Sequence, residues 1–181
     1  MSHIFKWNGV EYTIDKPNDD QILKYGIVVP YVQSSNAEEK VVIDEYIFWS
    51  ARLQSPIVIP VWFLTDLASI PKVFRTIVSK AGKTEIPSLP HDFGYAINGC
   101  QQPSTPTVSR KEWDGVLLDF CKQQEMGWVK RTLVYTAVRA GGYFAFKSEG
   151  DMFIPKVHRK FYIQRWPKLS LSEDVGDYIV L

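Results

Sequence analysis

The pattern of apolar and polar residues changes character near residue 69. Before that point the chain consists of short runs of β-branched and aromatic residues, which are typical of strands. The first run, IFKWNGVEYTI, has Asn8-Gly9 between its halves, and this dipeptide predicts a hairpin. The runs YGIVVPYVQ, KVVIDEYIFWSA and SPIVIPVWFLT follow. Pro56 and Pro60 in the last run predict an edge strand or two short strands, because proline has no backbone donor for a sheet.

After residue 69 the apolar spacing is helical. The segment SIPKVFRTIVSKAG repeats its apolar residues at intervals of three and four and predicts a helix from Ser69 to Gly82. A short second helix is expected to begin near Pro90, with His91 in its first turn, and to end by Asn98-Gly99.

Two later helices have the clearest patterns. SRKEWDGVLLDFCKQQEMG opens with Ser109 and Glu112, the pair of a capping box, and Gly127 is expected to close it. WVKRTLVYTAVRAGG predicts a further helix that ends at its Gly-Gly pair. The apolar stripe of the first of these helices consists of Trp113, Val116, Leu117, Phe120 and Cys121.

The segment from residue 146 onward shows no sustained periodicity and is expected to be extended. The predicted fold is therefore α+β. It has an antiparallel β part over residues 1–68, a small bundle of about four helices over 69–145, and an extended tail over 146–181. A chain of 181 residues is expected to form one compact domain plus this tail.

Composition narrows the class of protein. A hydrophobic content of 45% and a net charge of +1 fit a soluble globular chain with no general attraction to nucleic acid or anionic lipid. Cys100 and Cys121 follow no disulfide or metal pattern, so we expect reduced thiols in a protein made in a cytoplasm. We expect no signal peptide and no transmembrane segment, because the sequence lacks an apolar run of the necessary length.

The stretch SLPHDFGYAINGC holds one of only three histidines, His91, together with Asp92 and, one helical turn later, Tyr95. Asp114 lies near the start of the next long helix. If the two helices pack antiparallel, Asp114 meets His91 and orients the imidazole as a carboxylate does for a general base. Asp92 then stays free to bind a metal or a substrate group. The favoured alternative is that these residues only cap a helix and form core hydrogen bonds.

The stretch LTDLASIP places Asp66 between an apolar strand and a predicted helix. Capping of the turn is the more common use of such an aspartate. A metal-binding carboxylate directed into the same cleft as His91 is the alternative.

The tail is basic and aromatic between Pro155 and Lys168 and contains no acid there. This mixture favours contacts with a protein partner, because Trp, Tyr and Arg dominate binding hot spots. A plain solvated segment is the second alternative, and single-stranded nucleic acid is the least favoured partner. The candidate partner-binding residues are Arg159, Phe161, Tyr162, Arg165 and Trp166.

Four blocks in order, FLTDLASIP, LPHDFGYA, SRKEWDGVLLDF and YTAVRAGGYFAF, resemble a phage and prophage family, the domain of unknown function numbered 1353. The resemblance covers about residues 57–145, and Trp113 departs from it where a small residue usually precedes the aspartate. It implies a bacteriophage protein but no activity. By analogy we expect a virion- or tail-associated structural or assembly component. It would be made in the host cytoplasm and assembled into the virion, with other phage structural proteins or further copies of itself as partners.

The His-Asp-x-x-Tyr block followed by a helical aspartate is also similar to the phospholipase A2 pattern. That resemblance implies that His91 is a general base, Asp92 a Ca²⁺ ligand, and Asp114 with Tyr95 the orienting pair. The Gly-rich calcium loop of that family is absent from the upstream sequence IVSKAGKTEIPSL. A small metal-assisted hydrolase that acts on a lipid or cell-wall bond during infection or lysis is therefore the alternative function. HD-type phosphohydrolases match only at His91-Asp92, because the remaining histidines, His3 and His158, lie in other contexts.

Overall fold

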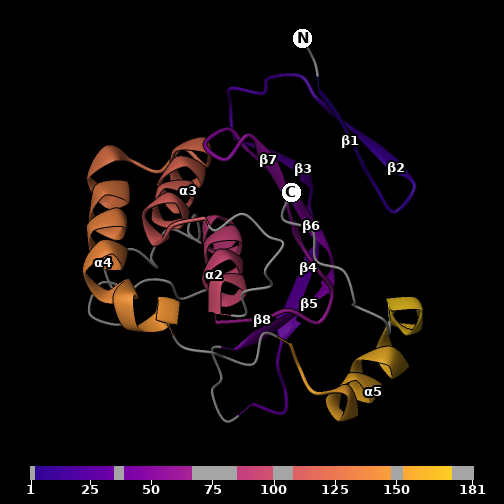
Figure 1. The fold of residues 1–181 in the computed structure, drawn as a ribbon. Coiled ribbons are helices and arrows are strands. Elements are labelled where there is room, and N and C mark those ends of the chain that lie inside the picture. The colour runs from indigo at the N-terminus through magenta and orange to yellow at the C-terminus, as the bar shows by residue number, and fades with distance from the viewer. Residues whose placement is uncertain (1–2, 35–38, 67–84, 100–107, 148–152, 173–181) are drawn as a thin grey trace.

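The computed structural model describes residues 3–34, 39–66, 85–99, 108–147 and 153–172 (Figure 1). The side chains of residues 98–99, 143–147 and 172 are outside this description. The helix predicted over residues 69–82 also lies outside the described residues.

The strands of the described part pair antiparallel and form three small sheets. The first sheet is the hairpin of β1 (His3–Trp7) and β2 (Val10–Ile14). The second contains β3 (Gln21–Lys24), β6 (Tyr46–Ser50) and β7 (Ser55–Ile59), in that order. The third contains β4 (Ile27–Pro30), β5 (Lys40–Asp44) and β8 (Leu64–Thr65).

The predicted hairpin is confirmed. Asn8 and Gly9 both have positive φ, 47° and 78°, as the tight turn between two twisted strands requires. The strands on either side pair from His3 with Ile14 to Trp7 with Val10.

The prediction from the two prolines is also confirmed. The run SPIVIPVWFLT divides at Pro60 into β7 and β8, and each is an edge strand of its sheet. The run KVVIDEYIFWSA divides as well, at Glu45, because β5 belongs to the third sheet and β6 to the second. The Glu45 carboxylate accepts a hydrogen bond from Trp7 Nε1 at 3.0 Å, which ties the hairpin to this junction.

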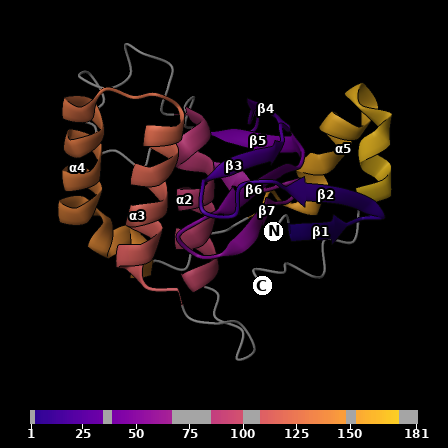
Figure 2. The same ribbon diagram turned by 90° about the horizontal axis from the view of Figure 1, so that it is seen from above.

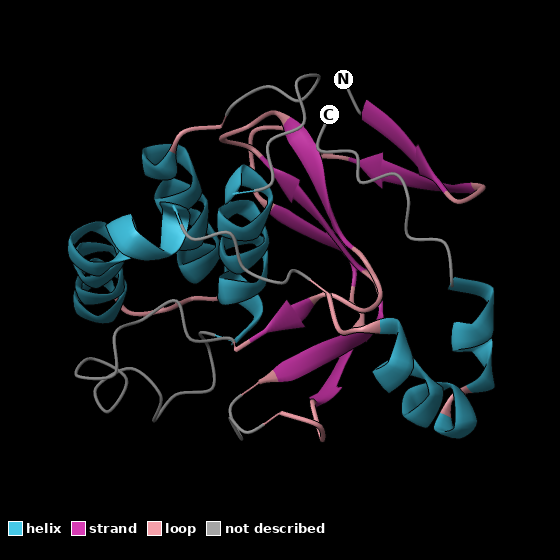
Figure 3. Cartoon of the chain, turned by 60° about the horizontal axis from the view of Figure 1, so that its bottom comes forward, coloured by secondary structure: helices cyan, strands magenta, loops and turns pink. Residues whose placement is uncertain are grey.

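The described helices are α2 (Glu85–Gly99), α3 (Arg110–Gln123), α4 (Trp128–Lys147) and α5 (Lys156–Arg165), followed by the 3₁₀ helix η2 (Pro167–Ser172). Helices α2, α3 and α4 pack against one another on one side of the strands, and α5 lies on the other side (Figures 2 and 3). The predicted fold class, antiparallel strands followed by helices, is confirmed. None of the helices within the described ranges is long and apolar enough to cross a bilayer.

The ends of three helices differ from the prediction. Helix α2 extends back to Glu85, so Pro90 and His91 lie inside the helix and not at its start. Proline there costs one backbone hydrogen bond, which the burial of the neighbouring Leu89 and Phe93 offsets. Helix α3 has the predicted capping box but ends at Gln123, before Gly127.

Helix α4 continues through Gly141-Gly142, where a C-cap was predicted. Gly142 serves close packing instead. A Cβ at this position would lie 2.5 Å from the hydroxyl oxygen of Tyr95, so glycine allows Tyr95 on α2 to reach the surface of α4.

The tail, predicted to be extended, contains helix α5. Tyr162 on this helix is buried against the third sheet, where its hydroxyl donates to the carbonyl of Pro30 at 3.0 Å and accepts from the Val32 amide at 3.1 Å. These long-range contacts stabilise a helix whose sequence has no apolar repeat of its own. Residues 173–181 of the predicted tail lie outside the description.

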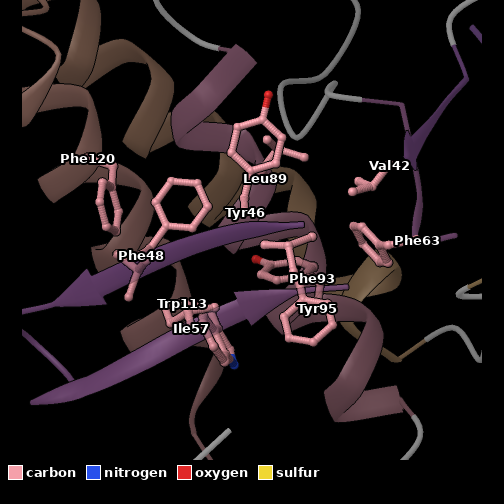
Figure 4. Packing of buried hydrophobic residues seen from close by; sticks show 12 residues of the cluster. Val42, Tyr46, Phe48, Ile57, Phe63, Leu89, Phe93, Tyr95, Trp113 and Phe120 are labelled. Carbon is pink, nitrogen blue, oxygen red and sulfur yellow. The ribbon is translucent and has the colours of Figure 1, made fainter. Parts of the chain in front are cut away.

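Strands and helices share the largest hydrophobic cluster (Figure 4). Phe48 of β6 meets Phe120 of α3 edge to face, with ring centroids 5.1 Å apart. Phe63 meets Phe93 of α2 in the same manner at 5.4 Å. The β part and α2–α3 are therefore held by common side chains, while the proposed boundaries near residues 68 and 145 stay predictions.

The tightest approach of α2 to α3 is at Gly94. A Cβ there would lie 2.0 Å from Cδ2 of Trp113, a fully buried ring. We expect Gly94→Ala to lower the free energy of unfolding by about 2 kcal/mol, because the overpacking outweighs the better helix propensity of alanine. Urea denaturation measures this change.

Gly127→Ala is the matched control. A Cβ at Gly127 meets no heavy atom within 4 Å, so the free energy of unfolding should change by less than about 0.5 kcal/mol. Equal midpoints for the two variants would contradict the close packing of α2 on α3.

Candidate functional site

Polar side chains from four separate parts of the chain converge where β8, α2, α3 and α4 meet. Each part belongs to one of the four sequence blocks described above. We call this set the polar cluster, and it consists of Thr65, His91, Asp92, Tyr95, Asp114 and Arg139.

Asp114 is the centre of the polar cluster. It is 0% exposed and its carboxylate is held by three side chains. Tyr95 donates to Oδ1 at 2.5 Å, Nε2 of His91 lies 3.1 Å from the same oxygen, and Arg139 donates to Oδ2 at 2.7 Å. The predicted contact between His91 and Asp114 is confirmed, as is the shared face of His91 and Tyr95, whose ring centroids are 4.1 Å apart. The catalytic use of these residues stays a prediction.

The two nitrogens of the His91 ring have different surroundings. Nε2 faces Asp114, whereas Nδ1 lies 3.6 Å from Oδ1 of Asp92, which is too long for a hydrogen bond. Nδ1 is buried, and within the part of the chain that the structure describes it has no hydrogen-bond partner. His91 therefore lies between two carboxylates but is hydrogen-bonded to only one of them.

Asp92 also takes part in the polar cluster through Thr65. Its Oδ2 accepts a hydrogen bond from the hydroxyl of Thr65 at 2.7 Å, and its side chain is 14% exposed. This contact joins α2 to the end of β8. A helical wheel of α2 alone could not show this contact, because Thr65 lies 27 residues away in the chain.

The cluster changes the protonation of its members. Burial lowers the pKa of His91, but the hydrogen bond to Asp114 and the charges of Asp114 and Asp92 raise it more, so the net shift is upward. Burial raises the pKa of Asp114, but hydrogen bonds from His91, Tyr95 and Arg139 outweigh it and the net shift is downward. A protonated His91 thus completes a row of alternating charges from Asp92 through His91 and Asp114 to Arg139.

Tyr95 and Arg139 are kept in their protonated forms. Burial, and then the hydrogen bond to the Asp114 carboxylate, raises the pKa of Tyr95. The hydrogen bond to Asp114 raises the pKa of Arg139 as well. Both side chains therefore stay donors to Asp114 over the physiological pH range. Arg110 adds a backbone tie, because its Nη1 donates to the carbonyl of Arg139 at 3.0 Å.

The calcium site that the phospholipase resemblance implies stays a prediction. Within the described ranges, no group of three or more His, Cys, Asp or Glu side chains is placed to hold a metal ion. Calcium takes about six to eight oxygen ligands, and one oxygen of Asp92 is already hydrogen-bonded to Thr65. Asp66 is partly buried directly after β8. Metal binding by Asp92 and Asp66 stays a prediction.

The five candidate partner-binding residues of the tail do not share one face. Tyr162 is 1% exposed, and Trp166 stacks on its ring. Arg159 lies over the ring of Trp62, 5.4 Å from the ring centroid. The partner-binding role of all five stays a prediction, and of the five only Phe161 and Arg165 are exposed.

Sequence reasoning missed Thr65 and Arg139 as members of the polar cluster. Both belong to blocks that were recognised for other reasons, Thr65 as the neighbour of Asp66 and Arg139 as part of a supposed helix end. A usable signal existed in the spacing of Arg139 and Gly142. Residues three apart lie on one helix face, and this face meets Tyr95 and Asp114.

Loss of the charge on Asp114 should destabilise the fold strongly. We expect Asp114→Asn to lower the free energy of unfolding by about 3 kcal/mol, because Arg139 and His91 lose their buried counter-ion. Asp119→Asn on the same helix is the control, since the pair that Asp119 forms with Arg52 is partly exposed and should contribute less than about 1 kcal/mol. Urea denaturation at neutral pH compares them, and equal losses would contradict a central role for Asp114.

The raised pKa of His91 makes stability depend on pH. A group whose pKa is raised by folding stabilises the folded state at pH values below its ordinary pKa, here 6.5. This contribution disappears as the pH rises through the pKa of the folded state. The lowered pKa of Asp114 gives the opposite loss as pH falls below 3.8. We expect the free energy of unfolding to decline above about pH 6.5 in the native protein and not in His91→Gln. An NMR titration of the His91 imidazole that gave a midpoint below 6.5 would contradict this assignment.

Comparison with known proteins gives one match. The family model described as "Protein of unknown function (DUF1353)" matches residues 41–138, just over half of the 181 residues. This span includes five of the six members of the polar cluster, and Arg139 follows it directly. No curated protein and no solved structure matches the chain. The chain belongs to the DUF1353 family of proteins of unknown function.

Proposed function

We propose that this protein is a bacteriophage structural or assembly component, associated with the virion or its tail, that acts through protein–protein contacts. The burial of the polar cluster carries this proposal. Asp114 is 0% and His91 2% exposed, and the charges of the cluster are balanced within the chain. Side chains that would have to meet a substrate are instead held by one another, which is the arrangement of a structural node.

The polar cluster links elements that have no short connection along the chain. It joins the end of β8 to α2 through Thr65 and Asp92, and α2 to α3 and α4 through Asp114. Movement of any one of these elements would break hydrogen bonds of the cluster. The cluster therefore holds the helices and the third sheet as one rigid body. Rigid presentation of surfaces is what an assembly component requires, because pre-ordered groups lose less entropy on binding.

The family resemblance and the composition support the same role. The resemblance is to phage and prophage proteins, and we propose synthesis in the host cytoplasm followed by assembly into the particle. The described surface also exposes large apolar side chains at sites far apart in the sequence, including Ile4 and Val10 on the hairpin and Trp128 and Val129 at the start of α4. Exposed apolar groups of this size are suited to contacts with partner proteins.

Mass spectrometry of purified particles tests this function. Particles are prepared from cells that carry the gene, banded by density and washed in high salt. We expect this chain in the particle fraction at a fixed ratio to the other particle proteins. Recovery only in the supernatant, at levels equal to a non-particle phage protein measured as a control, would overturn the proposal.

A second candidate, a small hydrolase, has one observation in its favour. Nε2 of His91 is oriented by Asp114, whereas Nδ1 has no hydrogen-bond partner within the described chain. An oriented imidazole with one unpaired, though buried, nitrogen within the described chain would suit a general base that takes a proton from water. Because the pKa of His91 is raised, the imidazole would act as a base only at pH values above the ordinary histidine pKa. The substrate would be a lipid or cell-wall bond.

Hydrolysis assays with matched variants separate the two candidates. Fluorescent phospholipid vesicles and purified peptidoglycan are incubated with the protein in calcium, in zinc and in EDTA. The structural proposal expects no turnover, and a loss of about 1–3 kcal/mol in the unfolding free energy of His91→Gln. Turnover that His91→Gln abolishes while the variant stays folded would favour the hydrolase. A metal-dependent rise in Tm that Asp92→Asn removes would identify Asp92 as a ligand.

A further inference from the structure

Helix α5 has two faces with different surroundings. The inner face carries Tyr162, which is buried against the third sheet. Another side of the helix carries Val157, 70% exposed, and Phe161, 44% exposed, whose ring meets the Tyr162 ring edge to face with centroids 5.2 Å apart. These two residues are four apart and form one apolar patch on the solvent side of the helix. Within the described structure, packing of α5 on its own chain therefore leaves Val157 mostly exposed and Phe161 partly exposed.

Positive charge surrounds this patch. Lys156, Lys160 and Arg165 are all exposed and lie next to Val157 and Phe161 along the helix. No aspartate or glutamate occurs between residues 155 and 172. We call these five residues the outer face of α5. Its chemistry requires a partner with both carboxylates and large apolar side chains.

The sequence of this chain contains such a segment. Residues 173–181, EDVGDYIVL, hold Glu173, Asp174 and Asp177, followed by four apolar residues and no base. The segment thus matches the outer face of α5 in charge and in apolar character. Nine extended residues span up to about 30 Å, and a ten-residue helix is about 15 Å long, so the segment is long enough to cover the whole face.

We propose that the outer face of α5 binds residues 173–181 of a second copy of this chain. This inference rests on the proposed assembly role. The contact joins two different surfaces, and such head-to-tail contacts build rings or extended arrays of identical subunits. Val157 and Phe161 supply the buried apolar area, while the lysines and Arg165 direct the acidic residues into register.

A charge-swap experiment on the full chain tests the contact. Sedimentation velocity over a range of concentrations measures association of the native protein, of Lys156→Glu/Lys160→Glu, and of Glu173→Lys/Asp174→Lys. We expect the native protein to associate and each double variant alone to lose association, because like charges then face each other. An equimolar mixture of the two variants should regain it, since each face again meets a segment of opposite charge.

Two further variants serve as controls. Lys111→Glu/Lys122→Glu changes the same charge on exposed residues of α3 and should associate like the native protein. Phe161→Ser keeps the charges, removes the apolar contact and should abolish association. Circular dichroism confirms that each variant is folded, which is expected because all the substituted positions of α3 and α5 are exposed.

Three results would overturn the inference. The native protein would stay monomeric at every concentration, or the mixed variants would fail to associate. Alternatively, the charge variants would change the sedimentation coefficient by the same amount at every concentration. This result would show that the segment binds α5 of its own chain. These outcomes are independent of the particle measurement. A chain present in particles but monomeric in solution retains the proposed function without this contact, and an associating chain absent from particles retains the contact without the function.

Discussion

A single buried carboxylate, that of Asp114, is the constraint on which the helical part of this protein depends. An ionised side chain removed from water costs several kcal/mol unless its oxygens are fully hydrogen-bonded. Here Tyr95 and His91 of α2 and Arg139 of α4 all turn toward it. Because one charge on α3 needs partners from two other helices, the positions of α2 and α4 are coupled through it.

The glycines of this region follow from the same constraint. An aspartate side chain is short, so its partners reach it only if the helices approach closely. Gly142 leaves room on α4 for the hydroxyl of Tyr95, and Gly94 leaves room on α2 for the ring of Trp113. The ring of Trp113 is fully buried at this contact, so the absence of a Cβ at Gly94 is what allows α2 and α3 to approach there.

The cluster also sets how the protein can act. With His91 between two carboxylates, the charges are balanced inside the fold and the imidazole favours its protonated form. This is the state that stabilises the structure and not the state that accepts a proton. We therefore assign the interior to rigidity and look to the surface for binding, where the outer face of α5 combines exposed apolar side chains with positive charge.

Sequence alone determined the features that depend on near neighbours. The Asn8-Gly9 turn, the division of a strand run by Pro60, and the capping box of Ser109 and Glu112 each involve residues only a few positions apart. The pairing of His91 with Asp114, 23 residues apart, could be predicted only on the condition that their two helices pack antiparallel.

Tertiary structure decided the rest, because those features depend on groups distant in the chain. Thr65 reaches Asp92 from 27 residues away, and Arg139 reaches Asp114 from 25. Helix α2 continues through Pro90 because its neighbouring residues are buried. Helix α4 continues through Gly142 because it packs against Tyr95 there. Helix α5 formed because the third sheet holds Tyr162. Local propensity is worth a few tenths of a kcal/mol per residue. Burial of an aromatic side chain contributes several times more, and an unpaired buried charge costs several times more, so the long-range contacts prevail.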